Sequence, residues 1–210
     1  MFTGLMRLFL RVCMVVTIMT VVSGVWHIAS AGKIYAKAWL AESLLDNAWQ
    51  KTKAGEQQVR PWPWADTWPV AELIVPRLGV REIILSGDSG RVLAFSPGFN
   101  EASALPGTHG KTLFSGHRDT HFTFLKDIKN GDVVEVLTAN DRFEYVVSEQ
   151  QVVDQRNFVL EAAIEAHDEY ELNHNSLILV TCFPFDALQP GGNGRYVVVA
   201  EEIRPKQTKT

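Results

Sequence analysis

The chain has 210 residues, of which 46% are hydrophobic, and its formal net charge at pH 7 is −4. This length suits one domain of ordinary size with an additional segment, and the hydrophobic content is enough for a substantial core. A slightly acidic chain offers no strongly basic surface, which argues against nucleic acid as a partner.

An uncharged stretch near the N-terminus covers residues 12–31. About twenty apolar residues in a helix are long enough to cross the hydrocarbon core of a bilayer. Arg7 and Arg11 precede this stretch. We therefore expect residues 1–32 to form a signal anchor with one transmembrane helix. Residues 29–31, Ala-Ser-Ala, also fit a signal-peptidase site, which leaves cleavage at that point as the alternative; either way the remainder is exported.

A second segment, residues 33–69, joins the anchor to the rest of the chain. Its first part places apolar side chains at helical spacing, which predicts an amphipathic helix that ends near Gly55: Tyr35, Ala38, Trp39, Leu45 and Trp49. The apolar face could lie on the bilayer, pack on the following domain or pair with another protein. Residues 60–69 contain three prolines and three tryptophans. They cannot be helical, and we expect a rigid strap laid against the domain.

From residue 70 to about 205 the pattern changes to short apolar runs separated by Gly, Pro, Asn and Asp, which is typical of β-strands. The predicted strands are 71–75, 81–86, 112–116, 133–137, 143–153 (one long strand or a bent pair), 176–182 and 195–204. Short helices are expected near 91–95 and within 157–167. Many short strands with few helices predict a mostly-β fold that closes as a small barrel.

Three residues of this domain have the chemistry needed for acyl transfer. Cys182 ends the apolar run 177–182, His117 follows a short apolar run and a glycine, and Arg195 opens the final run. A thiolate can attack a carbonyl, an imidazole can serve the leaving and entering amines, and a guanidinium can stabilise the oxyanion. The ordinary alternatives are a buried structural cysteine, a structural histidine and a surface ion pair. Cys13 lies in the apolar N-terminal stretch, so we expect no disulfide with Cys182.

The motif Leu179-Val180-Thr181-Cys182, with His117 upstream and Arg195 downstream, resembles the sortase family of cysteine transpeptidases. The resemblance covers about residues 70–203, and the strings 115–122 and 182–186 look most like sortases of Gram-negative bacteria. Ile178 departs from the family pattern, in which Thr or Ser is common at that position. The resemblance implies a closed eight-stranded β-barrel in which the penultimate strand ends at the cysteine and the last strand begins at the arginine. Cys182 and Arg195 would then lie side by side.

Other polar residues near the motif have competing interpretations. His109, His117 and His121 lie within thirteen residues, but their spacing matches no compact metal-ligand motif, and we expect no metal site. The resemblance likewise implies no obligatory cofactor. Asp119 and Asp186 could orient the site, but we interpret them as solvated loop carboxylates.

These observations predict a sortase-type transpeptidase that cuts a C-terminal Leu-Pro-x-Thr-Gly-like sorting signal of an exported protein through a Cys182 thioester. The acyl group would pass to an amine of the cell envelope or of a protein. We expect a single-pass protein of the inner membrane with its domain on the periplasmic side, and deletion through about Gly55 should release a soluble, active domain. The alternatives are a membrane-anchored cysteine peptidase and a non-catalytic exported β-barrel that binds a peptide.

Overall fold

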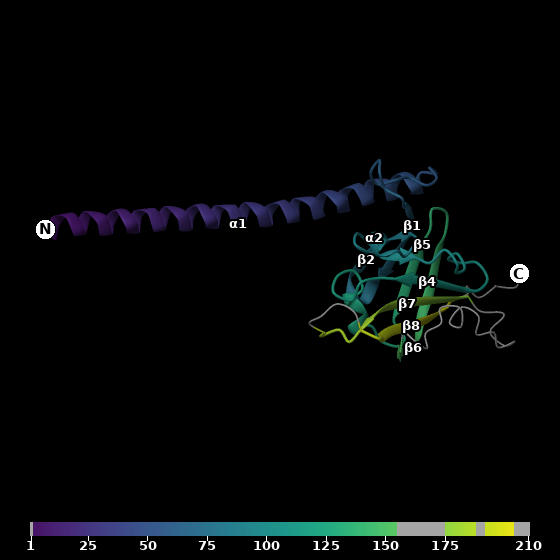
Figure 1. The fold of residues 1–210 in the computed structure, drawn as a ribbon. Coiled ribbons are helices and arrows are strands. Elements are labelled where there is room, and N and C mark those ends of the chain that lie inside the picture. Colours follow the sequence, from purple (N-terminus) through teal and green to yellow (C-terminus); the bar gives the residue numbers. More distant parts are fainter. Residues whose placement is uncertain (1, 155–174, 188–191, 204–210) are drawn as a thin grey trace, which may run out of the picture. The chain divides into compact units, whose positions relative to one another are not determined.

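The structure is a computed structural model that describes residues 2–154, 175–187 and 192–203. It divides into two compact units, residues 1–43 and 44–210 (Figure 1). The first element, α1, spans Phe2–Lys53 and contributes to both units. We describe each unit separately.

The part of α1 in the first unit has the composition of a membrane span. One apolar helix is long enough to cross a membrane, with a mean hydropathy of 2.0 in its most apolar window, and none of that window is buried. Within this stretch, the hydroxyls of Thr17 and Thr20 donate hydrogen bonds to the carbonyls four residues earlier, each at 2.9 Å. Both polar side chains are therefore satisfied inside the helix, as a bilayer requires. The N-terminal segment is a candidate membrane anchor, as expected.

The second unit is a closed eight-stranded β-barrel with short helices, which confirms the predicted fold class (Figure 1). Its elements are β1 (Pro69–Val75), the 3₁₀ helix η1 (Pro76–Leu78), β2 (Val80–Ser86), α2 (Gly90–Leu93), β3 (Gly98–Phe99), β4 (Lys111–Ser115), η2 (Thr123–Lys126), β5 (Val133–Leu137), β6 (Arg142–Asp154), β7 (Ser176–Phe183) and β8 (Gly194–Glu202). Around the barrel the strands follow the order β1-β2-β3-β4-β7-β8-β6-β5, and β5 pairs with β1 to close it.

Two strand pairs are parallel, β2 with β3 and β4 with β7. The second pair matters most for the site, because parallel neighbours deliver their C-terminal ends to the same rim of the barrel. In this pair Ser115 lies beside Val180. Strand β8 runs antiparallel to β7, so its first residues lie at that rim too. The ends of β4 and β7 and the start of β8 therefore meet at one place.

Alternation of side chains along each strand separates an inner from an outer layer. Leu177 and Leu179 on β7 face the barrel core together with Val198 and Ala200 on β8. A separate apolar cluster lies on the outer face and contains residues of β4, β7 and β8: Leu113, Ile178, Val180 and Val197. The strands at the site are thus buried on both faces, which explains their nearly continuous apolar sequence.

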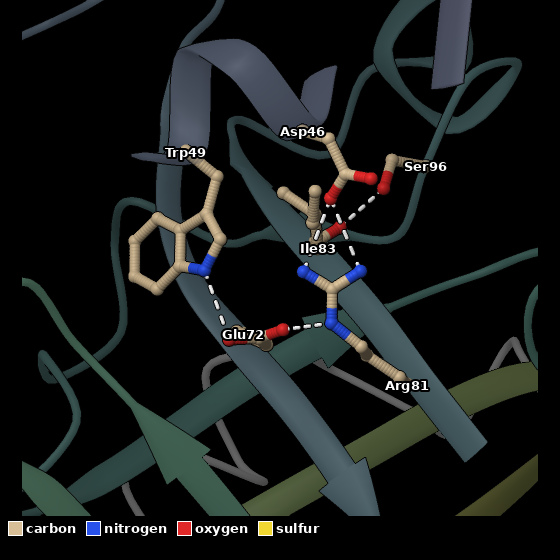
Figure 2. A network of polar contacts seen from close by, with 6 residues as sticks. All are labelled: Asp46, Trp49, Glu72, Arg81, Ile83 and Ser96. Carbon is tan, nitrogen blue, oxygen red and sulfur yellow. Dashed lines mark hydrogen bonds and ion pairs between the residues drawn. The ribbon is translucent and has the colours of Figure 1, made fainter. Parts of the chain in front are cut away.

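The last turns of α1 pack on the outer face of β1 and β2. Trp49 is completely buried and contacts Ile83 and Leu85 in one apolar cluster. Its indole Nε1–H donates a 2.9 Å hydrogen bond to the carboxylate of Glu72, which Arg81 also contacts. Figure 2 shows Arg81 between Glu72 and Asp46, whose carboxylate accepts hydrogen bonds from Arg81 at 3.1 Å. The sequence left open whether the apolar face of this helix meets the bilayer, the following domain or another protein. Its last turns pack on the domain.

The compact unit containing the barrel begins at Leu44. The sequence placed the start of the barrel domain at residue 70 and proposed Gly55 as a safe cutting point. A cut at Gly55 would remove Trp49 from a fully buried position, which argues against that cutting point. The helix itself ends at Lys53, close to the expected end at Gly55.

The Pro/Trp-rich connector lies against the domain as a strap, with one exception. Trp62 packs on Phe95 with ring centroids 4.8 Å apart, and the Thr67 hydroxyl donates a 2.7 Å hydrogen bond to the carbonyl of Ser86. Trp64 is 83% exposed and does not join this packing. The strap interpretation therefore describes Trp62 and Thr67 correctly but not Trp64.

The predicted strands all exist, with ends within two residues of the prediction. β6 is one long strand with a register shift between Val147 and Glu149, so it combines the two alternatives considered. The two-residue strand β3 and the helix η2 were not predicted. The helix expected within 157–167 lies outside the described residues.

Candidate active site

Cys182 lies on the outer face of β7, one residue before the end of the strand. It follows Ile178 and Val180, the two outward-facing apolar residues of this strand. Alternation places its sulfur on their side of the sheet and away from the barrel core. Cys182 is half-buried and forms no disulfide. A partly accessible thiol at a strand end differs from the inert buried cysteine considered as an alternative.

Arg195 lies directly opposite Cys182 in the antiparallel pair of β7 and β8. Opposite residues share a face of the sheet, with Cβ atoms about 4.5–5.5 Å apart. Arg195 is half-buried, and its Nη1 donates hydrogen bonds of 2.9 Å to the carbonyls of Gly192 and Gly194. The structure thus brings the two residues together as the resemblance implied.

His117 lies two residues beyond the end of β4, at the same rim as Cys182. The backbone just before it bonds to β7, because the Gly116 N–H donates to the Val180 carbonyl at 3.1 Å. The Thr181 hydroxyl donates to the Gly116 carbonyl at 2.7 Å. The residue before His117 therefore touches the residue before Cys182. The His117 side chain is exposed to solvent.

Glycine at position 116 is required by close packing. A Cβ atom there would lie 2.6 Å from the ring of Phe122, which is fully buried in the barrel core. The turn that carries His117 therefore packs directly on an aromatic ring. Any side chain at Gly116 would push this turn away from β7.

Three partly buried aromatic residues pack together at the ends of β7 and β8. Tyr196 stacks on Phe183 with an interplanar angle of 20° and makes an edge contact with Phe185 at 5.1 Å between ring centroids. Burial raises the pKa of Tyr196, so its phenol stays neutral around pH 7. These rings support the ends of β7 and β8 from the inner side.

The carboxylates near the site are placed as expected for solvated loop residues. Asp119 has a side chain that is 65% exposed and accepts a 3.2 Å hydrogen bond from Nε of Arg118. Asp186 is exposed. Sequence reasoning missed the neighbour of His117, Arg118, whose guanidinium is buried. The local sequence around Arg118 contains no periodic pattern or motif that distinguishes a buried arginine from an exposed one.

Among the described histidines, His121 contacts a carboxylate. His121 Nδ1 lies 2.9 Å from the Glu82 carboxylate on β2. Across residues 2–154, 175–187 and 192–203, no group of three or more His, Cys, Asp or Glu side chains could hold a metal ion.

The sortase domain model matches residues 73–203, more than half of the chain and nearly the whole barrel. The chain belongs to the sortase family. A curated relative, sortase D of Bacillus subtilis, is 28% identical over 133 residues, which is 62% of this chain and 62% of that protein. The chain thus matches less than two thirds of the length of this relative.

Solved sortase structures share the fold. A sortase D5 transpeptidase of Clostridium perfringens superposes with a TM-score of 0.60 at 22% identity, covering 77% of this chain and 99% of that one. Sortase A of Corynebacterium diphtheriae gives a TM-score of 0.58 at 22% identity, covering 80% and 86% of the two chains. The suggested similarity to Gram-negative sortases stays a prediction.

Proposed function

We propose that this protein is a sortase-type cysteine transpeptidase with Cys182 as nucleophile, His117 as acid and base, and Arg195 as oxyanion partner. The observation that carries the proposal is the placement of Cys182 opposite Arg195 on β7 and β8, with His117 at the end of the parallel neighbour β4. Family membership supports the same chemistry.

The first half of the reaction forms a thioester. The Cys182 thiolate attacks a peptide carbonyl, and the negative charge that develops on the carbonyl oxygen faces the Arg195 guanidinium. Collapse of this intermediate breaks the C–N bond. His117, as imidazolium, protonates the departing amine. The product is an acyl group on Cys182 and a neutral imidazole.

The second half transfers the acyl group. An entering amine gives a proton to His117 as its nitrogen attacks the thioester carbonyl, and Cys182 leaves as a thiolate. The cycle restores the thiolate and imidazolium with no redox step and no metal. Transfer to an amine rather than to water requires that the amine reach the thioester first.

The proposed substrate is the C-terminal sorting signal of an exported protein, of the Leu-Pro-x-Thr-Gly type. A sortase C of Clostridium perfringens with its C-terminal cell wall sorting motif has the same fold, with a TM-score of 0.57 at 18% identity. The acceptor would be an amine of the cell envelope or of a protein. The apolar part of α1 supports a single-pass membrane anchor. Its place in the inner membrane, with the barrel on the periplasmic side, is proposed from the resemblance to sortases of Gram-negative bacteria.

The test is to incubate the protein with a Leu-Pro-x-Thr-Gly peptide and an amine, and to follow intact mass. We expect an acyl adduct on Cys182 and a product joined to the amine. Cys182→Ala should abolish both, and Cys182→Ser should be nearly as inactive because a hydroxyl ionises far less readily than a thiol. Cys13→Ala is the matched control, since Cys13 lies in the other unit and should be dispensable.

The outcomes separate the alternatives. Adduct formation followed only by hydrolysis, whatever amine is added, would indicate the cysteine peptidase. Full activity in Cys182→Ala would refute the covalent mechanism. Absence of any adduct across varied peptides, with the thiol also unreactive toward alkylating agents, would favour the non-catalytic binding module.

A further inference from the structure

Arg118 follows His117 directly, and only 4% of its surface is exposed. Burial of an arginine is rare unless its charge is paired or its donors are satisfied. Here the burial lies within one residue of the proposed acid–base group. The partners of this buried guanidinium therefore bear on the placement of His117.

The guanidinium donates to the loop that follows Cys182. Its Nη1 donates a 2.7 Å hydrogen bond to the carbonyl of Pro184, and its Nη2 donates one of 3.1 Å to the carbonyl of Ala187. Pro184 is two residues after Cys182, and Ala187 is five. A single planar side chain thus joins the loop after β4 to the loop after β7, 66 and 69 residues apart in sequence.

Hydrogen bonds to its carbonyl groups also hold the backbone around His117. Three consecutive carbonyls accept hydrogen bonds. Gly116 accepts from the Thr181 hydroxyl at 2.7 Å, His117 from the Phe122 N–H at 3.0 Å, and Arg118 from the Thr123 hydroxyl at 2.8 Å. The carbonyls of residues 116–118 thus all accept hydrogen bonds, and the Arg118 guanidinium donates to the loop after β7.

We propose that Arg118 is a positioning residue that sets the place of His117 relative to Cys182 by holding the two loops together. The proposal rests on the function proposed for Cys182 and His117. A guanidinium suits this task because its rigid fork presents two donors at a fixed spacing, whereas the lysine ammonium is a point charge on a flexible stem. A misplacement of about 1 Å near a reacting centre can cost on the order of 100-fold in rate. Loosening this bridge should therefore affect turnover more than substrate binding.

The experiment compares Arg118→Met and Arg118→Lys with Arg91→Met in the full chain. Arg91 is the matched control because it forms an exposed ion pair with Asp66 on the outside of the domain. Turnover is measured with a Leu-Pro-x-Thr-Gly peptide and an amine, well below the unfolding midpoint of each variant. Hydrogen exchange by mass spectrometry follows the backbone of residues 183–187, and alkylation of Cys182 at alkaline pH measures the thiol itself.

For Arg118→Met we expect kcat to fall about 10- to 100-fold with KM within about threefold. Exchange in 183–187 should rise, and Cys182 alkylation should stay within about twofold because the thiol is unchanged. Arg118→Lys should recover part of kcat, since one ammonium can reach one of the two carbonyls. Arg91→Met should match the wild type in every measurement.

Three results would count against the proposal. If Arg118→Met keeps kcat within twofold while folded, or if exchange in 183–187 does not rise, Arg118 positions nothing. If kcat falls only in proportion to the folded fraction, its role is purely structural. An inactive wild type combined with faster exchange in Arg118→Met would instead refute the proposed function and leave the bridge between the loops standing.

Discussion

At the scale of single residues, the site depends on strand register. Cys182 and Arg195 share a face because they are opposite each other in an antiparallel pair, twelve residues of intervening chain notwithstanding. A slip of one residue in either strand would turn one of the two side chains to the inner face. Such a slip in β7 would also break the 2.7 Å hydrogen bond from the Thr181 hydroxyl to the Gly116 carbonyl.

Arg195→Lys tests whether the guanidinium does more than carry charge. We expect transpeptidation to fall by about 10²–10³, the typical cost of losing one oxyanion donor, because an ammonium lacks the planar fork. The measurement is kcat/KM with peptide and amine, with Arg91→Lys as the control for a general arginine-to-lysine effect. A loss of only a few-fold would reduce Arg195 to a structural partner of Gly192 and Gly194.

The identities of the candidate residues could be predicted from sequence, but the contacts that hold them could not. Cys182, His117 and Arg195 stand at the ends of recognisable strands, so local pattern and motif identify them. The bonds from Arg118 to Pro184 and Ala187 depend on how two loops meet in space. Local sequence patterns predict helices and strands, but not contacts between loops that lie far apart in the sequence.

At the scale of elements, the boundary of the folded unit lies inside helix α1. The turns with Leu45 and Trp49 cover the outer face of β2, where Ile83 and Leu85 are apolar. A periodic pattern shows that a helix is amphipathic, but it does not say what the apolar face meets. The same limit explains why β3 was missed: two residues are too few to establish any alternation.

A truncation test follows. A fragment that begins at Glu42 should be soluble, folded and active, because it keeps the buried turns of α1. A fragment that begins at Glu56 should unfold at a much lower temperature or aggregate, since it exposes Ile83 and Leu85 and removes the indole that donates to Glu72. Thermal unfolding and size-exclusion chromatography compare the two fragments.

A pair of point variants isolates the contribution of the indole. Trp49→Ala in the longer fragment should cost about 3–5 kcal/mol, and Trp64→Ala, at an exposed position, should cost within about 0.5 kcal/mol. Equal stability of the two variants would contradict the assignment of the α1 turns to the barrel.

The turns η1 and 129–132 are linked by a buried carboxylate. Asp132 pairs with Arg77 and accepts a 2.7 Å hydrogen bond from the Lys129 N–H. The hydrogen bond from Arg77 holds the pKa of Asp132 below its ordinary value. A lowered pKa in the folded state contributes stability above the unfolded-state pKa, and this contribution is lost as the pH falls through the folded-state pKa.

Asp132→Asn should therefore lower the unfolding midpoint at neutral pH, by the equivalent of about 1 kcal/mol. The difference from the wild type should shrink as the pH falls below the ordinary aspartate pKa of about 3.9 and toward the lowered pKa of the folded state. Unfolding midpoints between pH 2 and pH 7 provide the test. Asp66→Asn, which removes an exposed ion pair, is the control. A difference that stays constant over this range would contradict an ionic role for Asp132.

At the scale of the whole molecule, the chain joins an apolar helix of membrane-spanning length to a barrel of the sortase family. A tether in the bilayer would concentrate the enzyme near substrates held in the same membrane. The apolar side chains of α1 from Phe9 to Ile28 are extensively exposed, which is the surface that lipid would cover. Composition and length predicted an apolar helix here, and the structure has one.

If the anchor is retained, the full-length protein should stay in the membrane fraction after an alkaline wash. N-terminal sequencing of the protein from native membranes should then find the residues that precede the apolar stretch. Recovery of protein that begins only at Gly32 would show cleavage after Ala31 and refute the anchor. A fragment that begins at Glu42 should appear in the soluble fraction and serves as the control.

The direction of the strands also determines where this protein can be attached to other materials. β8 begins beside Cys182 and runs away from it, so Glu202 lies at the opposite rim, close to the turn 138–141 that precedes β6. A fluorescent reporter inserted in that turn, or a bead coupled through it, would be separated from Cys182 by the full length of the barrel. Immobilised in this way, the protein would present the candidate residues Cys182, His117 and Arg195 to the solution, the orientation that the proposed transpeptidation would need in a reusable reagent.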